Sequence, residues 1–289
     1  MQWRSPEIRA LVALALSEDD ARQDITSRLL IPTNVRLKAA FVAKQRGVVC
    51  GLPLAAAFFK ALAPSARVRP LVREGAVVRP GQAFLRIEGP ARVILAAERP
   101  ALNAVQHLSG IATYTAAQVA RLGRGKTQLL DTRKTLPGWR ALEKYAVRCG
   151  GGKNHRQSLG DAVLVKENHV FIGRAAGIDW VARLRRFRAA KPAFPVQVEI
   201  QSWADLKQVV LIRPQRVLVD NQPPATLKKM MAALRRALPG VEIEISGGVR
   251  PDDLARLARL NPERISMGRL THSAPAFDCS LDILHVQVR

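Results

Sequence analysis

Beyond about residue 123, short apolar runs alternate with stretches that carry helix signals. Six runs are clear, at 128–131, 162–166, 196–200, 217–220, 243–246 and 264–267. Gly150 would end one helix, and Ser202 with Asp205 forms a capping box that would begin another. Because strands that alternate with helices run parallel, we predict an α/β fold: an open TIM-like (β/α) barrel of about seven strands over residues 111–275. Two alternatives are open for the tail, 276–289: it forms the seventh strand of the barrel, or it returns to the first domain.

Residues 1–110 have a different pattern, with extended runs at 35–43, 68–72, 77–78 and 84–87 that are separated by Gly and Pro turns. They predict an N-terminal α+β sandwich domain. The hairpins are similar to those of biotinyl or lipoyl carriers, but a carrier needs a lysine at the hairpin tip, and no lysine lies between Lys60 and Lys126. A helix over 98–122, with Pro100 in its first turn, would bridge the domains.

Composition favours a protein that binds anionic ligands and argues against a membrane protein or a cysteine-rich metal protein. A net charge of +23 attracts anionic ligands and, less specifically, nucleic acid, although many of the cations fall on predicted helix faces. No apolar run approaches the roughly 20 residues of a membrane helix, and no export signal precedes Asp20. Cys50, Cys149 and Cys279 are far apart and form no CxxC or Cys/His cluster, so we expect a cytoplasmic protein without such a metal centre.

Polar residues fall where the predicted barrel strands end. Asp131 leads to Arg133 and Lys134, and the later runs end at Lys166, Glu199, Asp220 and Ser246, with Gly268 after the last. In a parallel barrel these positions surround one mouth, where active sites of this architecture form. The nearby cations Arg133, Lys134, Arg156 and Lys166, with His155 and His169, suit a small ligand that carries several negative charges.

Each of these features also has a plain structural interpretation. The Arg133–Lys134 pair can be a basic loop, and His155 can cap the glycine run that precedes it. Glu199 and Asp220 can be buried partners of Arg or Lys, or they can bind Mg²⁺, which prefers oxygen ligands. A two-carboxylate glycosidase would not need this density of cations. A nucleic-acid-binding protein should interleave aromatic residues with the basic ones, and aromatic residues are only 5% of this chain.

Several motifs in this order carry a family resemblance. They are Asp-Thr-Arg-Lys-Thr-Leu-Pro-Gly at 131–138, Glu-Lys-Tyr-Ala-Val at 143–147, Gly-Gly-Gly-Lys-Asn-His-Arg at 150–156, Leu-Val-Lys-Glu-Asn-His at 164–169, Val-Asp-Asn at 219–221, Ser-Gly-Gly at 246–248 and Gly-Arg-Leu-Thr-His-Ser at 268–273. Together they resemble the quinolinate phosphoribosyltransferases. The resemblance implies an open seven-stranded barrel with a sandwich domain. It also implies transfer of phosphoribosyl from phosphoribosyl pyrophosphate to quinolinate, giving nicotinate mononucleotide, CO₂ and pyrophosphate.

The resemblance also implies roles for the residues at matching positions. Arg133, His155, Arg156 and Lys166 would bind the quinolinate carboxylates, and Lys134 the pyrophosphate. Glu199 and Asp220 would hold Mg²⁺, possibly through water, and the ribose hydroxyls; with Lys134 and Lys166 they make the expected catalytic set. The 5′-phosphate would lie at Ser246, Gly247, Gly268 and His272.

Two further residues are assigned by the resemblance. His169 would orient the loop of Lys166, and Arg99 would enter the active site of the partner subunit of a homodimer. Gln197 and Gln201 flank Glu199 where the family usually has acids. A molybdenum-transport-associated relative of the same fold is an alternative, but Lys166 with Asn168 and His169 argues against it. Neither a specific nucleic acid nor a membrane partner is expected.

Overall fold

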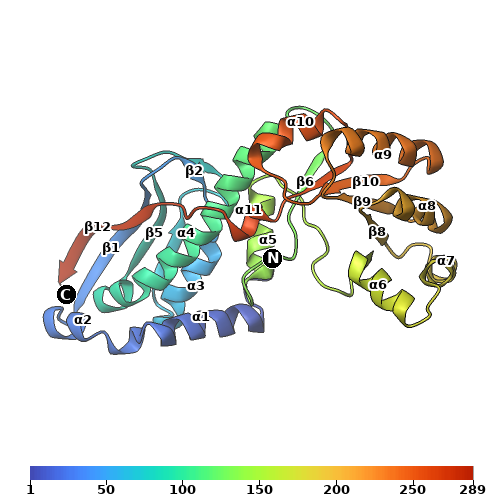
Figure 1. Cartoon of the computed structure of the whole chain (residues 1–289). Helices are drawn as coiled ribbons and strands as arrows, with labels where there is room; N and C mark the ends of the chain where they lie inside the picture. The colour runs from blue at the N-terminus through green and yellow to red at the C-terminus, as the bar shows by residue number, and fades with distance from the viewer. Residues whose placement is uncertain (289) are drawn as a thin grey trace. The chain divides into compact units, whose positions relative to one another are not determined.

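The computed structural model describes residues 1–288, and its contacts divide the chain into two units. The first unit takes in residues 1–117, 135–151 and the segment from 270 onward; the second takes in 118–134 and 152–269. The chain therefore passes between the units several times, and the segment 135–151 belongs to the first unit, although the strand–helix alternation had included it in the barrel. Figure 1 shows the elements of each unit along the chain.

The first unit is built on an antiparallel sheet with the strand order β12-β1-β5-β3. Its strands are β1 Val35–Ala43, β3 Arg67–Pro70, β5 Ala83–Pro90 and β12 Cys279–Val288, and a short ladder joins β2 Gly47–Val48 to β4 Val77–Val78. The tail returns to this domain, because β12 pairs with β1 from Val35↔Val288 to Ala43↔Cys279 (Figure 1). It therefore adds no seventh strand to the barrel.

The helices of the first unit cover this sheet and supply most of its core. They are α1 Pro6–Glu18, α2 Ile25–Leu30, α3 Leu52–Leu62, α5 Arg140–Cys149 and most of α4 Ala91–Leu122, with a 3₁₀ turn η1 Ala21–Gln23; α11 Arg269–His272 lies at the unit's edge. The bridging helix was predicted to begin near residue 98, which is wrong, since α4 begins at Ala91 and Pro100 lies inside it. Burial of Ile94 and Ala97 carries the helix through a proline that removes one backbone bond.

The second unit contains a six-stranded parallel sheet with the order β6-β11-β10-β9-β8-β7. The strands are β6 Gln128–Leu130, β7 Val163–Val165, β8 Val196–Ile200, β9 Arg216–Asp220, β10 Glu242–Ser246 and β11 Arg264–Ser266. An isolated parallel bridge joins Leu130 to Lys153 beside β6. The predicted open barrel is confirmed, with six strands in the described chain rather than about seven, because only Lys153 pairs where a further strand would lie.

Helices connect these strands as the alternation predicted. They are α6 Glu167–Ala175, α7 Trp180–Ala190, α8 Trp203–Ile212, α9 Pro224–Ala237 and α10 Leu254–Ala258, with the 3₁₀ turn η2 Pro251–Asp253. The Ser202–Asp205 capping box is present at the start of α8. Within residues 1–288, no helix has both the length and the apolar character that are needed to cross a membrane.

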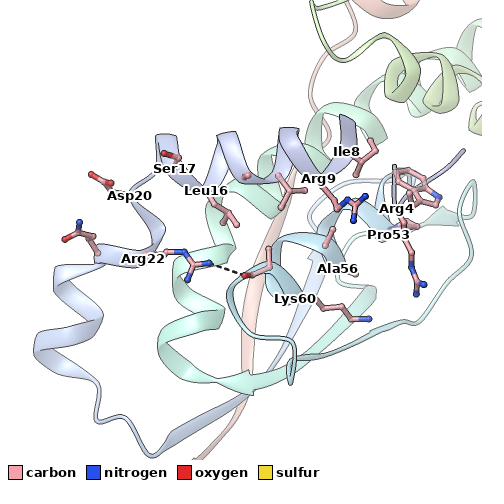
Figure 2. Close-up of a pocket in the computed structure, with 16 residues that line it drawn as sticks. Arg4, Ile8, Arg9, Leu16, Ser17, Asp20, Arg22, Pro53, Ala56 and Lys60 are labelled. Carbon is pink, nitrogen blue, oxygen red and sulfur yellow. Dashed lines mark hydrogen bonds between the residues drawn. The ribbon is translucent and has the colours of Figure 1, made fainter. Parts of the chain in front are cut away.

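A hollow of the first unit lies between α1 and α3 and has a volume of about 970 Å³ (Figure 2). Ile8, Val12 and Leu16 of α1 line it, with Ala56 and Lys60 of α3. None of the predicted site residues is among the described residues that line this hollow. The predicted site residues lie instead mainly at the carboxyl ends of the parallel strands.

Candidate functional site

The predicted polar residues of the second unit gather at one edge of its sheet. Lys166 follows β7, Glu199 lies near the end of β8, Asp220 and Ser246 end β9 and β10, and Gly268 comes shortly after β11. All neighbouring strands of this sheet pair in parallel, so their carboxyl ends meet at the same edge. The fold thus brings these residues to one end of the barrel.

Glu199 and Asp220 are linked at this edge through neighbouring side chains. Lys166 Nζ lies 3.2 Å from Glu199 Oε2, with 51% of the lysine side chain and 8% of the glutamate side chain exposed. The amide of Gln201 donates to Glu199 Oε1 at 3.5 Å and to Asp220 Oδ2 at 3.4 Å. Glu199 is therefore paired with a lysine, which is the structural interpretation of this residue. The carboxylates of Glu199 and Asp220 nevertheless lie in one small region, since both contact the Gln201 amide.

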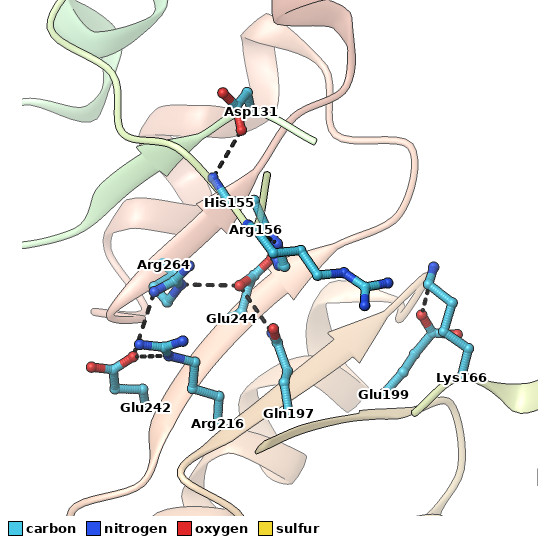
Figure 3. A network of polar contacts seen from close by, with 10 residues as sticks. All are labelled: Asp131, His155, Arg156, Lys166, Gln197, Glu199, Arg216, Glu242, Glu244 and Arg264. Carbon is cyan, nitrogen blue, oxygen red and sulfur yellow. Dashed lines mark hydrogen bonds and ion pairs between the residues drawn. The ribbon is translucent and has the colours of Figure 1, made fainter. Parts of the chain in front are cut away.

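His169 fixes the backbone at Lys166. Lys166 is the N-cap of α6, and its backbone N–H donates to His169 Nδ1 at 3.0 Å. An N-cap of this kind holds the first turn of a helix in place. That His169 orients the Lys166 loop for catalysis stays a prediction; the Lys166 ammonium group reaches Glu199 (Figure 3).

Asp131 positions the loop of His155. This aspartate is fully buried, accepts the backbone N–H of His155 at 2.8 Å and also accepts the side-chain amide of Asn154. The backbone N–H of Arg156 donates to His155 Nδ1 at 2.8 Å. That bond makes Nδ1 an acceptor, so Nε2 carries the proton in the neutral imidazole and faces Glu244.

Glu244 is a site residue that the sequence reasoning missed. It is fully buried and accepts from Gln197 Nε2 and from Arg264 Nε, each at 3.0 Å, while His155 Nε2 lies 3.4 Å away (Figure 3). Burial raises the pKa of Glu244, but His155, Arg264 and Gln197 together outweigh burial and lower the pKa to about 2. The alternation of Glu242, Glu244 and Ser246 with isoleucines was a signal that could have revealed it.

Arg133 and Arg156 form the cationic part of the site. Burial lowers the pKa of Arg156, and the positive charge of Arg133 lowers it further, so the two guanidinium groups repel each other. The Arg156 side chain also donates to the carbonyl of Ala162 at 3.2 Å and extends toward Lys166 and Glu199 in Figure 3. Two arginines held close together favour a ligand with more than one negative charge.

The turn after β10 brings backbone close to the end of β9. Gly247 has a φ of +89°, and a Cβ placed on it would lie 2.4 Å from Asn221 Oδ1 and 2.5 Å from the Asn221 nitrogen. The Asn221 N–H donates to the Ser246 carbonyl at 3.2 Å. Only glycine fits this approach without a shift, and such glycine turns leave backbone N–H groups available to anions.

The remaining predicted residues lie outside this set of contacts. Arg99 is exposed on α4 and His272 is at the end of α11, both in the first unit, where Ser273 Oγ lies 2.7 Å from His272 Nδ1. Lys134 is exposed in the second unit, and its backbone N–H donates to Thr132 Oγ1 at 3.0 Å.

Comparison with known proteins gives a consistent result. The sequence models named quinolinate phosphoribosyl transferase, N-terminal domain and C-terminal domain, match residues 24–109 and 111–282. The nicotinate-nucleotide pyrophosphorylase [carboxylating] of Mycobacterium leprae is 39% identical over 264 residues, covering 90% of this chain and 91% of that protein. A chloroplastic protein of the same name from Oryza sativa is 38% identical, covering 96% of this chain and 78% of its own length.

Solved structures agree with the sequence relatives. The nicotinate-nucleotide pyrophosphorylase from Francisella tularensis superposes with a TM-score of 0.88 at 32% identity, covering 97% of this chain and 98% of that one. NadC from Streptococcus pyogenes gives 0.86 at 32% identity, covering 98% and 97%. With both domain models matched over nearly all of the chain and the fold shared throughout, the chain belongs to the quinolinate phosphoribosyltransferase family.

Proposed function

We propose that this chain transfers phosphoribosyl from phosphoribosyl pyrophosphate to quinolinate with decarboxylation. Family membership supports the reaction class, and relatives carry the name quinolinate phosphoribosyltransferase [decarboxylating]. The observation that carries the proposal is the set of charged residues at the carboxyl ends of the parallel strands, where Lys166 Nζ lies 3.2 Å from Glu199 Oε2 and the Gln201 amide contacts both Glu199 and Asp220. Neither of the alternatives, a molybdenum-transport-associated relative or a nucleic-acid-binding protein, is favoured by these findings.

The reaction needs no covalent enzyme intermediate. The pyridine nitrogen of quinolinate forms a bond to C1 of the ribose as the bond from C1 to the pyrophosphate oxygen breaks. The 2-carboxylate then leaves as CO₂, the electron pair of the broken bond stays on C2, where the positive charge of the quaternised ring nitrogen stabilises it, and a proton bonds to C2. Positioning and charge stabilisation are the contributions required of the protein.

Arg133, Arg156 and Lys166, with His155, would hold the two carboxylates of quinolinate against the ribose carbon. Arginine suits this task because its planar fork matches a carboxylate. Lys166 is held near its place by Glu199 at 3.2 Å, so it can exchange one carboxylate for another when quinolinate binds. The lysine end of this pair is open to solvent, with 51% of its side chain exposed, whereas the Glu199 side chain is 8% exposed and keeps the lysine at the site.

Glu199 and Asp220 fit a Mg²⁺ ion. Both carboxylates contact the same Gln201 amide group, so oxygen ligands lie within one small region. This donor set suits a hard cation that keeps several waters and bridges substrate phosphates. When bound, Mg²⁺ would neutralise charge on the departing pyrophosphate. The same carboxylates would hold the ribose hydroxyls and favour a positively charged ribose carbon.

The phosphates would be bound at the other strand ends. The glycine turn of Ser246 and Gly247, together with Gly268 and His272, would hold the 5′-phosphate, and Lys134 the pyrophosphate. The tight approach of Gly247 to Asn221 supports a backbone cradle here, because no side chain obstructs the turn.

Catalysis would require a homodimer, and the protein would be located in the cytoplasm. Arg99 lies in the first unit, is exposed and matches the family arginine that enters the partner's site. The free thiols of Cys50, Cys149 and Cys279 support a reducing compartment.

Substrate choice tests the proposal. With phosphoribosyl pyrophosphate and Mg²⁺, the protein should form nicotinate mononucleotide from quinolinate but not from nicotinate, because nicotinate offers one carboxylate fewer to the half-buried Arg133 and Arg156. Arg156→Ala should abolish turnover, while Arg183→Ala on an exposed face of α7 should not change it. Comparable turnover of both pyridines would refute the proposed pocket.

A further inference from the structure

Outside the candidate site, the first unit brings two thiols and a carboxylate together. One ligand atom each from Cys50, Glu74 and Cys149 lies within 4.8 Å of the other two. The three residues come from different parts of the sequence, which is why their spacing did not predict a metal site. All three belong to the first unit. The fold therefore brings together two cysteines whose spacing in the sequence forms no metal-binding motif.

Main-chain contacts hold the two cysteines in place. Cys50 is fully buried, its N–H donates to Ser109 Oγ at 2.9 Å, and its carbonyl accepts from the same hydroxyl at 3.1 Å. Cys149 ends α5, and a Cβ on the following Gly150 would lie 2.3 Å from the Ala112 carbonyl oxygen. Both cysteines are thus fixed against the same helix, α4, and their positions do not depend on each other's sulfur.

Glu74 is fixed from the third side. Its carboxylate accepts the N–H of Gly51 at 3.1 and 3.0 Å and the N–H of Leu52 at 2.8 Å, at the start of α3. A Cβ on Gly75 would lie 3.3 Å from the Cys149 carbonyl oxygen, so this turn packs against the end of α5. Metal-binding carboxylates are commonly hydrogen-bonded in this way, and Oε2, which of these two N–H groups accepts only that of Gly51, keeps a lone pair for an ion.

Hydrogen bonds link the two thiols to each other and to Tyr145. A hydrogen bond to Cys149 and then burial raise the pKa of Cys50 well above its ordinary range. A hydrogen bond from Cys50 lowers the pKa of Cys149 against the effect of burial, and Tyr145 adds a second hydrogen bond. The two sulfurs and the Tyr145 hydroxyl are thus close neighbours, and a divalent ion bound to the thiolates would displace the thiol protons.

We propose that Cys50, Cys149 and Glu74 form a Zn²⁺ site. Two thiolates and one carboxylate suit zinc and exclude Mg²⁺ and Ca²⁺, which prefer oxygen alone. Zn–S bonds of about 2.3 Å in a tetrahedron place two sulfurs roughly 3.8 Å apart, which a separation within 4.8 Å permits. Tyr145 or a water supplies the fourth ligand. Bound zinc would tie the segment at Cys50 and the turn at Glu74 to the end of α5.

Cobalt provides the test, because thiolate-bound Co²⁺ has a charge-transfer absorption that oxygen-bound Co²⁺ lacks. Untagged, reduced protein should bind one Co²⁺ per chain with this absorption, and Zn²⁺ should displace it. Cys50→Ser and Cys149→Ser should each remove about half of the absorption and weaken binding at least about tenfold. Cys279→Ser, another buried cysteine, is the matched control and should bind normally. Binding at Glu199 and Asp220 gives no thiolate band, so failure of the proposed reaction leaves this result unaffected.

Two results would overturn the zinc site. One is the absence of a thiolate band in wild-type protein at Co²⁺ concentrations well above that of the protein. The other is a band that survives in the folded Cys50→Ser/Cys149→Ser double variant. If the serine variants do not fold, alkylation of Cys149 in native wild-type protein decides: Zn²⁺ should slow it at least about tenfold, and an unchanged rate refutes the site.

Discussion

Replacing Glu244 by Gln should destabilise the second unit in a way that depends on pH. Glu244 is fully buried, and its pKa is lowered from 4.5 to about 2 by His155, Arg264 and Gln197 against the effect of burial. A difference of that size between the unfolded and folded chain is worth about 3 kcal/mol at neutral pH. Breaking a buried charge pair in other proteins costs about 3–5 kcal/mol, which agrees.

The direction of the pH dependence follows from the lowered pKa. Because the folded chain binds the proton less tightly than the unfolded chain, the stabilisation is complete above about pH 5 and is lost as the pH falls toward 2. The free energy of unfolding of Glu244→Gln should therefore be about 3 kcal/mol below wild type at pH 7. At pH 3 the deficit should be about half of that or less, since much of the wild-type advantage has then disappeared.

Urea unfolding followed by circular dichroism at both pH values measures these differences. Glu242→Gln is the matched control, two residues earlier on the same strand, where the carboxylate pairs with Arg216 at 2.7 Å but is 45% exposed. Its effect should not exceed about 1 kcal/mol. A Glu244→Gln protein as stable as wild type at pH 7, or equally destabilised at pH 7 and pH 3, would show that the buried charge does not stabilise the fold.

Three further outcomes are expected. Arg99→Ala and Lys166→Ala should each inactivate a folded dimer. Mixed dimers of the two variants should regain up to about half of the wild-type activity, because one of their two sites is then intact. If mixtures with proven heterodimers stay inactive, Arg99 does not act in the partner's site. Gly247→Ala should cost about 1–3 kcal/mol through its clash with Asn221, measured by thermal unfolding, whereas Gly240→Ala, with a similar φ of +83° and open space around it, should cost less. DNA binding caused by the +23 charge should be non-specific and fall about 10³-fold or more between 50 and 200 mM salt in a filter-binding assay; tight sequence-selective binding at physiological salt would contradict this.

Local sequence patterns predicted the positions of the strands well, because the formation of a strand depends largely on residues that are neighbours in the sequence. The runs at 35–43 and 196–200 coincide with β1 and β8, whose apolar residues are buried. The place of β12 was left open, since strand pairing across the chain is not written in either strand's own sequence. Pro100 misled the helix boundary, because burial on both sides of it outweighed the local preference.

The site was predicted as far as parallel strands determine it. Lys166, Glu199 and Asp220 lie at one edge because strand direction alone brings them there. Glu244 was missed because a charged residue on a buried strand has no local sign of its partners, which come from other strands and loops. The meeting of Cys50 with Cys149 is likewise a product of long-range packing.

The pairing of β1 with β12 has a consequence for the order in which the chain matures on the ribosome. The end of β1 at residue 43 and the start of β12 at residue 279 are 236 positions apart (279 − 43). At roughly 5–20 residues per second, β1 would wait about 10–50 s for its neighbour. During that time its edge can pair with other chains. The first unit begins to be synthesised first but completes its sheet only after the entire barrel has been translated.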